Sequence, residues 1–478
     1  MSEAGSLGAK AASGAAWSGI STIVLRMGSL VVGIALARLL TPEEFGVYAV
    51  ALTVQSILMT VADLGLSADL VRSEDPERIA PTVASLGLIS GATTTAITVG
   101  ASSFLADQLG SPQAAPAVAV LAFTLLLAGV SLVPYAMMLR RFQQRELFWV
   151  GVADFIVSTS VTLSLVLMGW GVMGLAIGRV AAQIVSSAMQ FYLAKVKPRF
   201  AIDRDVVRPV LSFGVPIAMA NLLAWGLINI DNVVLARVAG ATALGYYVLA
   251  FNISNWPMNA LSQSVRAISL PYFSRTQGSS EGLVKLAAIG WAAALPAGSV
   301  LAALSVPLIS VLYGERWLTA APVLAALGVF GSLRVAFDIF TGYLYAQGQS
   351  RPVFWIQVIW LVTLTLGMIF ATSAYGIIGA GWVHVIIGAG VILPAYLIVL
   401  ARRGVAVTLL AKRAAWPTFA TVPTVVVAIL AERLLTGVVL QLLAGGVAAL
   451  VVYGILVWPW GRRELRGIRQ PQGAADDS

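Results

Sequence analysis

The chain has 478 residues, of which 59% are hydrophobic and only 11% are charged. Soluble proteins carry about 25% charged residues, so this composition indicates an all-α protein that crosses a membrane many times. The formal net charge of +9 is explained by membrane topology, and we expect no nucleic-acid partner. The absence of cysteine excludes disulfides, thiolate metal sites and thiol catalysis.

Apolar runs long enough to cross a bilayer recur along nearly the whole chain. The first is too long for a cleavable signal peptide and lacks a cleavage-site pattern, so we expect it to remain a membrane helix. Together with their Pro-rich or charged breakers, the runs predict about fourteen helices. In chain order these lie near 15–38, 45–70, 81–105, 116–138, 148–168, 171–194, 210–236, 243–267, 283–312, 320–346, 352–373, 376–400, 414–435 and 437–459.

One sequence pattern occurs twice in the chain, and the two copies are 199 residues apart. Leu36–Ala51 and Leu235–Ala250 share a Leu-Ala-Arg triplet, a glycine, a tyrosine and an alanine. Later matches follow in the same order: Phe148-Trp149 returns as Phe354-Trp355, and Gly171 and Gly174 return as Gly376 and Gly379. We interpret these matches as two homologous six-helix halves.

The basic segment 195–208 joins the two halves. We therefore expect an N-terminal six-helix lobe at 1–200, its repeat at 201–402, and an extra helix pair with a basic cytoplasmic tail at 403–478. Because six is even, both halves enter from the same side, and a pseudo-twofold axis along the membrane normal should relate them. Binding sites in such proteins lie between the halves, and one half rocks against the other during transport.

The basic residues predict the orientation. Most Lys and Arg fall on the side of both termini, whereas the opposite side has only Arg38, Arg237, Arg316 and Arg433. Since basic loops stay in the cytoplasm, we expect both termini there.

A polar stripe is the strongest candidate for a binding surface. Asn252, Asn255, Asn259 and Ser262 follow i, i+3, i+7, i+10 spacing on one helical face. The equivalent positions of the first half, Thr53, Ser56, Thr60 and Asp63, are all polar. We interpret the two stripes as walls of a hydrated cavity, and the alternative is that they form interhelical hydrogen bonds.

Arg26 lies about midway along the first helix, where a cation needs a carboxylate, a carbonyl, water or an anionic ligand. Pairing with Asp63 or Asp231 is the alternative to binding a ligand. Asp231 also belongs to a cluster with Asn229 and Asn232, which would bind a cation or form a polar joint.

Arg179 and His384 occupy equivalent positions in the two halves. Either they line two walls of a cavity, or they are packed between helices. Arg334 and Asp338 are spaced i, i+4, and we expect them to neutralise each other.

Other chemistry is not indicated. A single histidine without cysteine leaves no transition-metal constellation, and no segment has the pattern of a P-loop. The glycine pairs at 171–174 and 376–379 are too short for a dinucleotide fingerprint, so we interpret them as packing or turn glycines. We expect no cofactor and no catalytic activity.

The Leu36–Ala51 stretch reads Leu-Ala-Arg-x-Leu-x-Pro-x-x-Phe-Gly-x-Tyr over its first thirteen residues. It resembles the polysaccharide-transport (Wzx-like) branch of the multidrug/oligosaccharidyl-lipid/polysaccharide exporter superfamily. The resemblance implies flipping of an undecaprenyl-pyrophosphate-linked oligosaccharide from the inner to the outer leaflet of a bacterial plasma membrane, for export of a surface polysaccharide. It also implies a cavity lined by helices 1, 2, 7 and 8, in which relatives with anionic substrates tend to carry arginines. Arg26 maps onto that feature, and its helix-7 counterpart is Trp225.

Two alternatives remain from the sequence. A drug or small-cation exporter of the same superfamily would usually stop at twelve helices. A membrane sugar ligase or polymerase would need an outside loop rich in catalytic groups, and the predicted outside loops are short. Besides the lipid-linked substrate, we expect contacts with membrane lipids and with a polysaccharide polymerase or export machinery.

Overall fold

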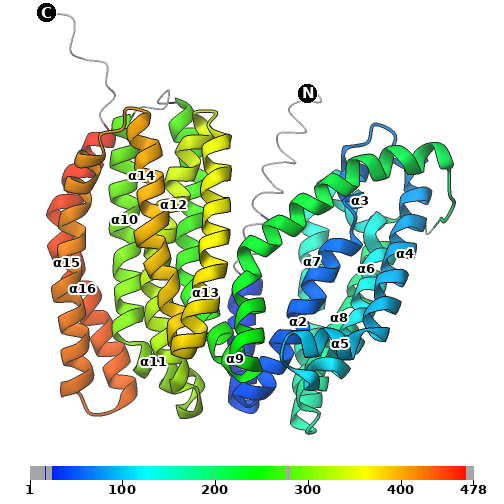
Figure 1. The fold of residues 1–478 in the computed structure, drawn as a ribbon, viewed down its shortest axis with the longest axis horizontal. Helices are drawn as coiled ribbons and strands as arrows, with labels where there is room; N and C mark the ends of the chain where they lie inside the picture. Colours follow the sequence, from blue (N-terminus) through cyan, green and yellow to red (C-terminus); the bar gives the residue numbers. More distant parts are fainter. Residues whose placement is uncertain (1–16, 18–23, 198, 276–279, 470–478) are drawn as a thin grey trace, which may run out of the picture. The chain divides into compact units, whose positions relative to one another are not determined.

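The computed structural model describes residues 17, 24–197, 199–275 and 280–469, and every regular element among them is a helix. The chain forms two compact units, Met1–Gly245 and Tyr246–Ser478 (Figure 1). The predicted all-α polytopic class is confirmed. The lobe boundaries expected at 200 and 402 stay predictions, since by packing the chain divides at Gly245 instead.

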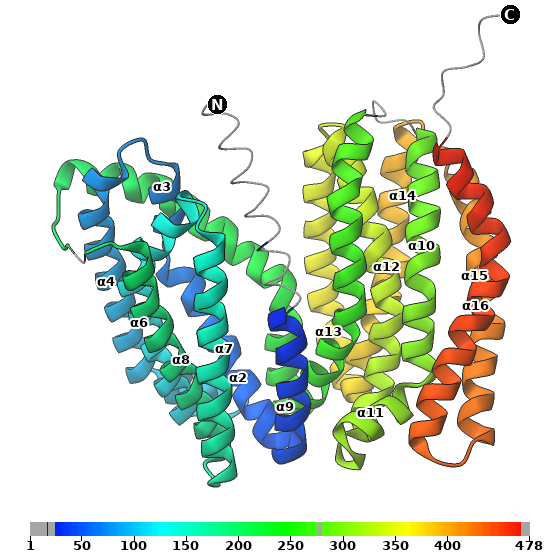
Figure 2. The ribbon, with the colours of Figure 1, turned by 180° about the vertical axis from the view of Figure 1, so that it is seen from behind.

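The first unit begins, among the described residues, with a helix at 24–39. It continues with α2 (Pro42–Ala62), α3 (Leu66–Arg72), α4 (Pro76–Gly100), α5 (Ser102–Gln108), η1 (Pro112–Ala114), α6 (Ala115–Arg140), α7 (Gln144–Leu167), α8 (Gly171–Ala194) and the first part of α9 (Arg204–Arg275). Figure 2 shows α7 and α8 side by side, with α6 packed on α8. The α9 helix is interrupted by a non-helical residue at Gly240.

The second unit holds the rest of α9. It continues with α10 (Ser280–Ala303), α11 (Ser305–Tyr313), η2 (Glu315–Ala320), α12 (Ala321–Ala346), α13 (Ser350–Ile387), η3 (Gly388–Ile392), α14 (Leu393–Arg402), α15 (Val407–Leu434) and α16 (Val438–Arg469). In this unit α10 packs against α12 and α15, and α15 packs against α16.

The described residues contain 12 candidate membrane spans by length and hydropathy. One of them, Ser350–Arg402, has 53 residues and is interrupted at Gly376, where φ is 59° and ψ is −144°. A straight helix of that length would measure about 80 Å, more than twice the bilayer core of about 30 Å. The break therefore falls where the sequence predicted two helices, while the total of fourteen stays a prediction.

The duplicated stretch is the turn that starts α2. The Glu44 N–H donates to Thr41 Oγ1 at 3.2 Å, and the Thr41 N–H donates to the Glu44 carboxylate at 2.8 Å. This reciprocal arrangement is a capping box, and Pro42 stands at the first helical position, where its missing N–H costs nothing. The pattern that marks the family is thus also a helix-start signal.

The shared glycine of the duplicated stretch is a helix contact. A Cβ on Gly46 would collide with the carbonyl oxygen of Ala241, and a Cβ on Gly245 would collide with that of Pro42. Each obstructing carbonyl lies four residues before the partner glycine, so the contact is reciprocal. Equivalent positions of two repeats are expected to meet in this way.

A second glycine contact occurs in both halves of the sequence. Gly87 of α4 faces the backbone of Gly129 of α6, and Gly298 of α10 faces the backbone of Gly328 of α12. Gly129 and Gly328 are separated by the same offset of 199 residues as the duplicated stretch. At both crossings a Cβ on either glycine would lie 3.0 Å or less from the carbonyl oxygen of the facing glycine, so the helix backbones are in close contact.

The reciprocal contact predicts a sharp difference between two glycine substitutions. Gly46→Ala places a methyl group against backbone that no side-chain rotation can clear, so we expect a loss of about 1–3 kcal/mol of stability. Gly33→Ala is the matched control, because no heavy atom lies within 4 Å of the added methyl group. Thermal unfolding of the purified variants measures both. Equal melting temperatures for the two variants would show that the close contact is not formed.

Candidate functional site: a polar cavity at a helix break

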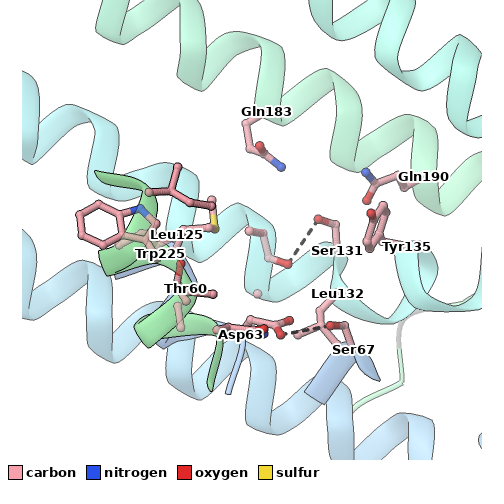
Figure 3. A pocket seen from close by; sticks show the side chains of 17 residues that line it. Thr60, Asp63, Ser67, Leu125, Ser131, Leu132, Tyr135, Gln183, Gln190 and Trp225 are labelled. Carbon is pink, nitrogen blue, oxygen red and sulfur yellow. Dashed lines mark hydrogen bonds between the residues drawn. The ribbon is translucent and has the colours of Figure 1, made fainter. Parts of the chain in front are cut away.

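A cavity of about 530 Å³ lies within the first unit, between α2, α3, α6, α8 and α9 (Figure 3). Its polar lining comes from separate parts of the chain: Thr60, Asp63, Ser67, Ser131, Tyr135, Gln183, Gln190, Asn221 and Trp225. Its apolar lining consists of Met59, Ala62, Leu125, Ala128, Gly129, Leu132, Ala224 and Ile228. Polar side chains gathered inside an apolar bundle are expensive, and they generally mark a binding site or a transport path.

The cavity depends on a break in the predicted helix 45–70. The helix ends at Ala62, and Leu64 and Gly65 adopt left-handed φ values of 47° and 67° before α3 begins at Leu66. A Cβ on Gly214 of α9 would collide with the Leu64 carbonyl oxygen, so the bare backbone of α9 covers the break. The prediction of one continuous helix was wrong at this point, because a glycine distant in sequence supports the interruption.

Asp63 stands at the break, and its carboxylate accepts a hydrogen bond from the Ser67 hydroxyl at 3.1 Å. At the other end of the same row of α2 residues, the indole N–H of Trp225 donates to Ser56 Oγ at 3.1 Å. These two contacts fix the ends of the wall that α2 contributes. Thr60 lies between them, and its hydroxyl donates to the Ser56 carbonyl of its own helix at 3.0 Å.

The α8 wall carries two glutamines seven residues apart, on one helical face (Figure 3). Gln183 Nε2 donates to Ser187 Oγ at 3.4 Å, and Ser187 Oγ donates to Ser131 Oγ at 3.2 Å. Gln190 is only 9% exposed, and its buried Oε1 has no hydrogen-bond partner among the described residues. A buried acceptor left unsatisfied costs about 1–3 kcal/mol, so this oxygen is an unfavourable feature of the cavity wall.

The electrostatic character of the cavity follows from its lining. It contains one carboxylate, Asp63, and no lysine, arginine or histidine lines it among the described residues. Such a surface attracts cations and neutral hydrogen-bonding groups and repels phosphate. The amides, hydroxyls and aromatic rings therefore fit polyhydroxylated compounds better than anions.

Only some residues of the two predicted polar stripes line the cavity. Thr60 and Asp63 line the cavity, whereas Thr53 is 5% exposed and its hydroxyl donates to Ala49 O at 2.8 Å. In the second unit, Asn252 is exposed and Asn255 Oδ1 accepts from Arg334 Nη1 at 2.8 Å, while Asn259 is half-buried. A cavity wall at Asn252, Asn255 and Asn259 stays a prediction.

The predicted charged residues have varied surroundings. Arg26 is exposed on the helix at 24–39, whereas Asp231 is 4% exposed. Arg179 Nη1 forms an ion pair with Asp154 Oδ2 at 3.0 Å, and Ser186 Oγ donates to Asp154 Oδ1 at 2.8 Å. Arg179 thus ties α8 to α7 and is not among the residues that line the cavity.

His384 belongs to a packed region of the second unit. It is 4% exposed, with Nδ1 3.0 Å from Ala380 O and Nε2 3.4 Å from the Tyr247 hydroxyl. The Phe330 ring lies against it, with the two ring centroids 5.2 Å apart. These contacts are those of a packed residue, and a role of His384 in a cavity wall stays a prediction.

Much of the cavity lining has no signal in the sequence patterns described above. Tyr135, Gln183, Gln190 and Asn221 lie outside the predicted stripes, and Trp225 is marked only as the counterpart of Arg26. The spacing of Gln183 and Gln190 was an available signal, since two amides on one face of a membrane helix need a reason.

The fold and the cavity define a class of protein: a multi-pass, all-helical membrane protein with a polar cavity built into one bundle. A family model described as "Polysaccharide biosynthesis protein" matches residues 35–322, more than half of the chain. The chain belongs to this family, and the family resemblance expected from Leu36–Ala51 is confirmed.

Individual relatives agree with that assignment. The chain is 26% identical to the succinoglycan biosynthesis transport protein ExoT of Rhizobium meliloti over 360 residues, which cover 74% of this chain and 71% of the relative. It is also 26% identical to the lipopolysaccharide biosynthesis protein WzxC of Escherichia coli over 343 residues, covering 69% and 68%. A solved structure of the lipid II flippase MurJ, in an inward closed conformation, matches with a TM-score of 0.74 at 14% identity. That match covers 92% of this chain and 99% of MurJ, and it shows the shared fold.

The cavity predicts a pattern of thiol accessibility in a chain that has no native cysteine. Cysteines at Thr60, Ser67 and Gln183 should react with a small charged thiol reagent, because these side chains line the cavity. A cysteine at Thr98, which is 1% exposed, is the matched control and should stay unreactive. Labelling in membranes, read by mass shift, checks this. Protection of all four positions would contradict a water-filled cavity.

Proposed function

We propose that this protein flips an undecaprenyl-pyrophosphate-linked oligosaccharide across a bacterial plasma membrane by alternating access, for export of a surface polysaccharide. The observation that carries the proposal is the polar cavity of about 530 Å³ inside an apolar bundle of this family. A site of this size is in the range of small-molecule pockets, about 300–1,000 Å³, and so takes part of an oligosaccharide. The name of ExoT, a biosynthesis transport protein, and that of MurJ, a lipid II flippase, support transport of a lipid-linked sugar, and WzxC is named for lipopolysaccharide biosynthesis.

In this proposal the cavity of the first unit binds sugar rings. The Asp63 carboxylate accepts from sugar hydroxyls, and the Gln183, Gln190 and Asn221 amides supply further polar contacts. The rings of Trp225 and Tyr135 offer apolar faces with a polar edge, which suits the mixed surface of a sugar. Because no cation lines the described cavity, the pyrophosphate has to be balanced elsewhere.

Arg26 is the candidate for the pyrophosphate. It lies on an exposed part of the helix at 24–39, in the first unit. A cation in the middle of a span is expensive unless it meets an opposite charge or water, and an anionic headgroup in transit supplies the charge. In this proposal the cavity binds the sugar, and Arg26 balances the negative charge of the pyrophosphate.

We also propose that both termini lie in the cytoplasm, as the distribution of basic residues predicts, so that substrate enters from the cytoplasmic leaflet. A polysaccharide polymerase or export machinery on the outer side is the expected consumer of the flipped product.

Gln190 provides a test that separates recognition from stability. Gln190→Leu keeps the side-chain volume and removes the unsatisfied buried oxygen, so the melting temperature should stay the same or rise while glycan export falls at least tenfold. Gln55→Leu is the matched control, because the Gln55 amide donates to Thr124 Oγ1 at 2.8 Å. That variant should lower the melting temperature and keep its export per molecule of protein. Surface glycan and protein abundance in a strain lacking the native gene measure both, and normal export by Gln190→Leu would refute a binding role.

If Arg26 binds the pyrophosphate, loss of its positive charge should reduce glycan export. Arg26→Ala should abolish export at near-normal abundance, and Arg26→Lys should keep part of it, because a point charge still binds phosphate. The competing explanation is that Arg26 only neutralises a buried Asp63 or Asp231. In that case Arg26→Ala should lower abundance, and removal of the aspartate as well should restore abundance and export. Such a rescue would contradict the proposal that Arg26 binds the pyrophosphate of the substrate.

A further inference from the structure

A second cavity of about 210 Å³ lies at one end of the first unit, where α4 begins and α6 and α8 end. These three helices are candidate membrane spans, so the cavity lies at the depth where lipid headgroups are found. It shares no residue with the cavity at the helix break.

The cavity combines a basic rim with an apolar interior. Arg141, Lys195, Lys197 and Arg199 line it, against a single acidic residue, Glu77. None of these five side chains forms an ion pair within the part of the chain that the structure describes. The lining thus carries an excess of positive charge that the described protein does not neutralise.

The apolar part is supplied by aliphatic residues of α4 and α6 and by two phenylalanines. Phe191 projects from the last turn and a half of α8, and Phe200 follows in the segment that leads to α9. Phe200 is 49% exposed, so its ring is accessible to a lipid chain at this end of the bundle.

The basic rim is tied to the bundle by backbone contacts. Arg141 Nη1 donates to the Ala194 carbonyl at 2.8 Å, which joins the ends of α6 and α8. Across the opening, the Ala201 N–H donates to Pro81 O at 3.3 Å and the Asp203 N–H donates to Thr82 Oγ1 at 3.1 Å. The segment that carries the basic residues is therefore held over the start of α4.

We propose that this cavity binds an anionic phospholipid of the surrounding membrane. The phosphate lies among Arg141, Lys195, Lys197 and Arg199, and the upper acyl chain runs along Phe191 and Phe200. Basic pockets between membrane helices on the cytoplasmic side are suited to such headgroups. At about 210 Å³ the cavity is smaller than the 300 Å³ or so of sites that enclose a whole small-molecule ligand, so it takes a headgroup and excludes an oligosaccharide.

The consequence concerns the segment between α8 and α9. This segment joins the two repeats, and a bound phospholipid would fix it at the headgroup level of one leaflet. The inference does not depend on the transported substrate, and it holds for any member of the transporter class with this lining.

The test measures binding of phosphatidylglycerol and of phosphatidylcholine to the purified full-length protein by native mass spectrometry. We expect preferential binding of phosphatidylglycerol. Lys197→Gln combined with Arg199→Gln should weaken it about 25-fold, because each charge near a headgroup contributes about fivefold in affinity. The charge-preserving pair Lys197→Arg and Arg199→Lys should bind as the unchanged protein does.

The matched control is Arg462→Gln combined with Arg463→Gln, which removes two positive charges from the exposed end of α16. Phosphatidylglycerol affinity should be unchanged in that variant. Equal weakening by both pairs would reduce the effect to net charge and overturn the site, and so would equal binding of the two phospholipids. Displacement of the lipid by inorganic phosphate alone would overturn the acyl-chain contact, and tighter binding of undecaprenyl diphosphate would assign the cavity to the substrate instead.

Discussion

The backbone contact between the helix break at Asp63–Gly65 and Gly214 of α9 is the constraint on which the candidate site depends. In the bilayer core a helix can be interrupted only where protein covers the freed backbone. Gly65 and Gly214 have no side chains, so the two segments approach each other at backbone distance. This contact ends α2 at Ala62 and starts α3 at Leu66, which leaves Asp63 at the cavity instead of on a continuous helix face.

The distribution of charge divides the chemistry of the first unit. The cavity at the break has a single carboxylate and amide and hydroxyl partners, whereas the lysines and arginines of segment 195–199 lie at the end of the bundle. Arg179, which could have made the interior cationic, is held by Asp154 in a contact between α7 and α8. In the two proposals above, the polar cavity takes neutral sugar hydroxyls, and the basic end of the bundle takes an anionic phospholipid headgroup.

Glycine contacts connect the repeat to the packing of the helices. Membrane helices gain little from burying apolar side chains against one another, so close backbone contact and small residues contribute more of their association. Gly46 with Gly245, and Gly129 with Gly328, are equivalent positions of the two halves, and all four lie in such contacts. The duplication is thus preserved where a side chain would separate two helices.

The sequence determined the membrane class, the order of the helices and the family, because hydropathy, turn residues and short motifs are local properties. It placed α8 at 171–194 and the break near Gly376, where a glycine with positive φ ends a helix. It also predicted Thr60 and Asp63 as cavity residues from helical spacing; both line the cavity, and their role in binding stays a prediction.

Only the tertiary structure decided which polar residues share a cavity. Gln190, Tyr135 and Trp225 come from three helices far apart in the sequence, and no local pattern brings them to Asp63. The same holds for the break after Ala62, since its support comes from Gly214, about 150 residues further along the chain. Long-range packing against other helices set these features, whereas the spacing of residues within one helix could not.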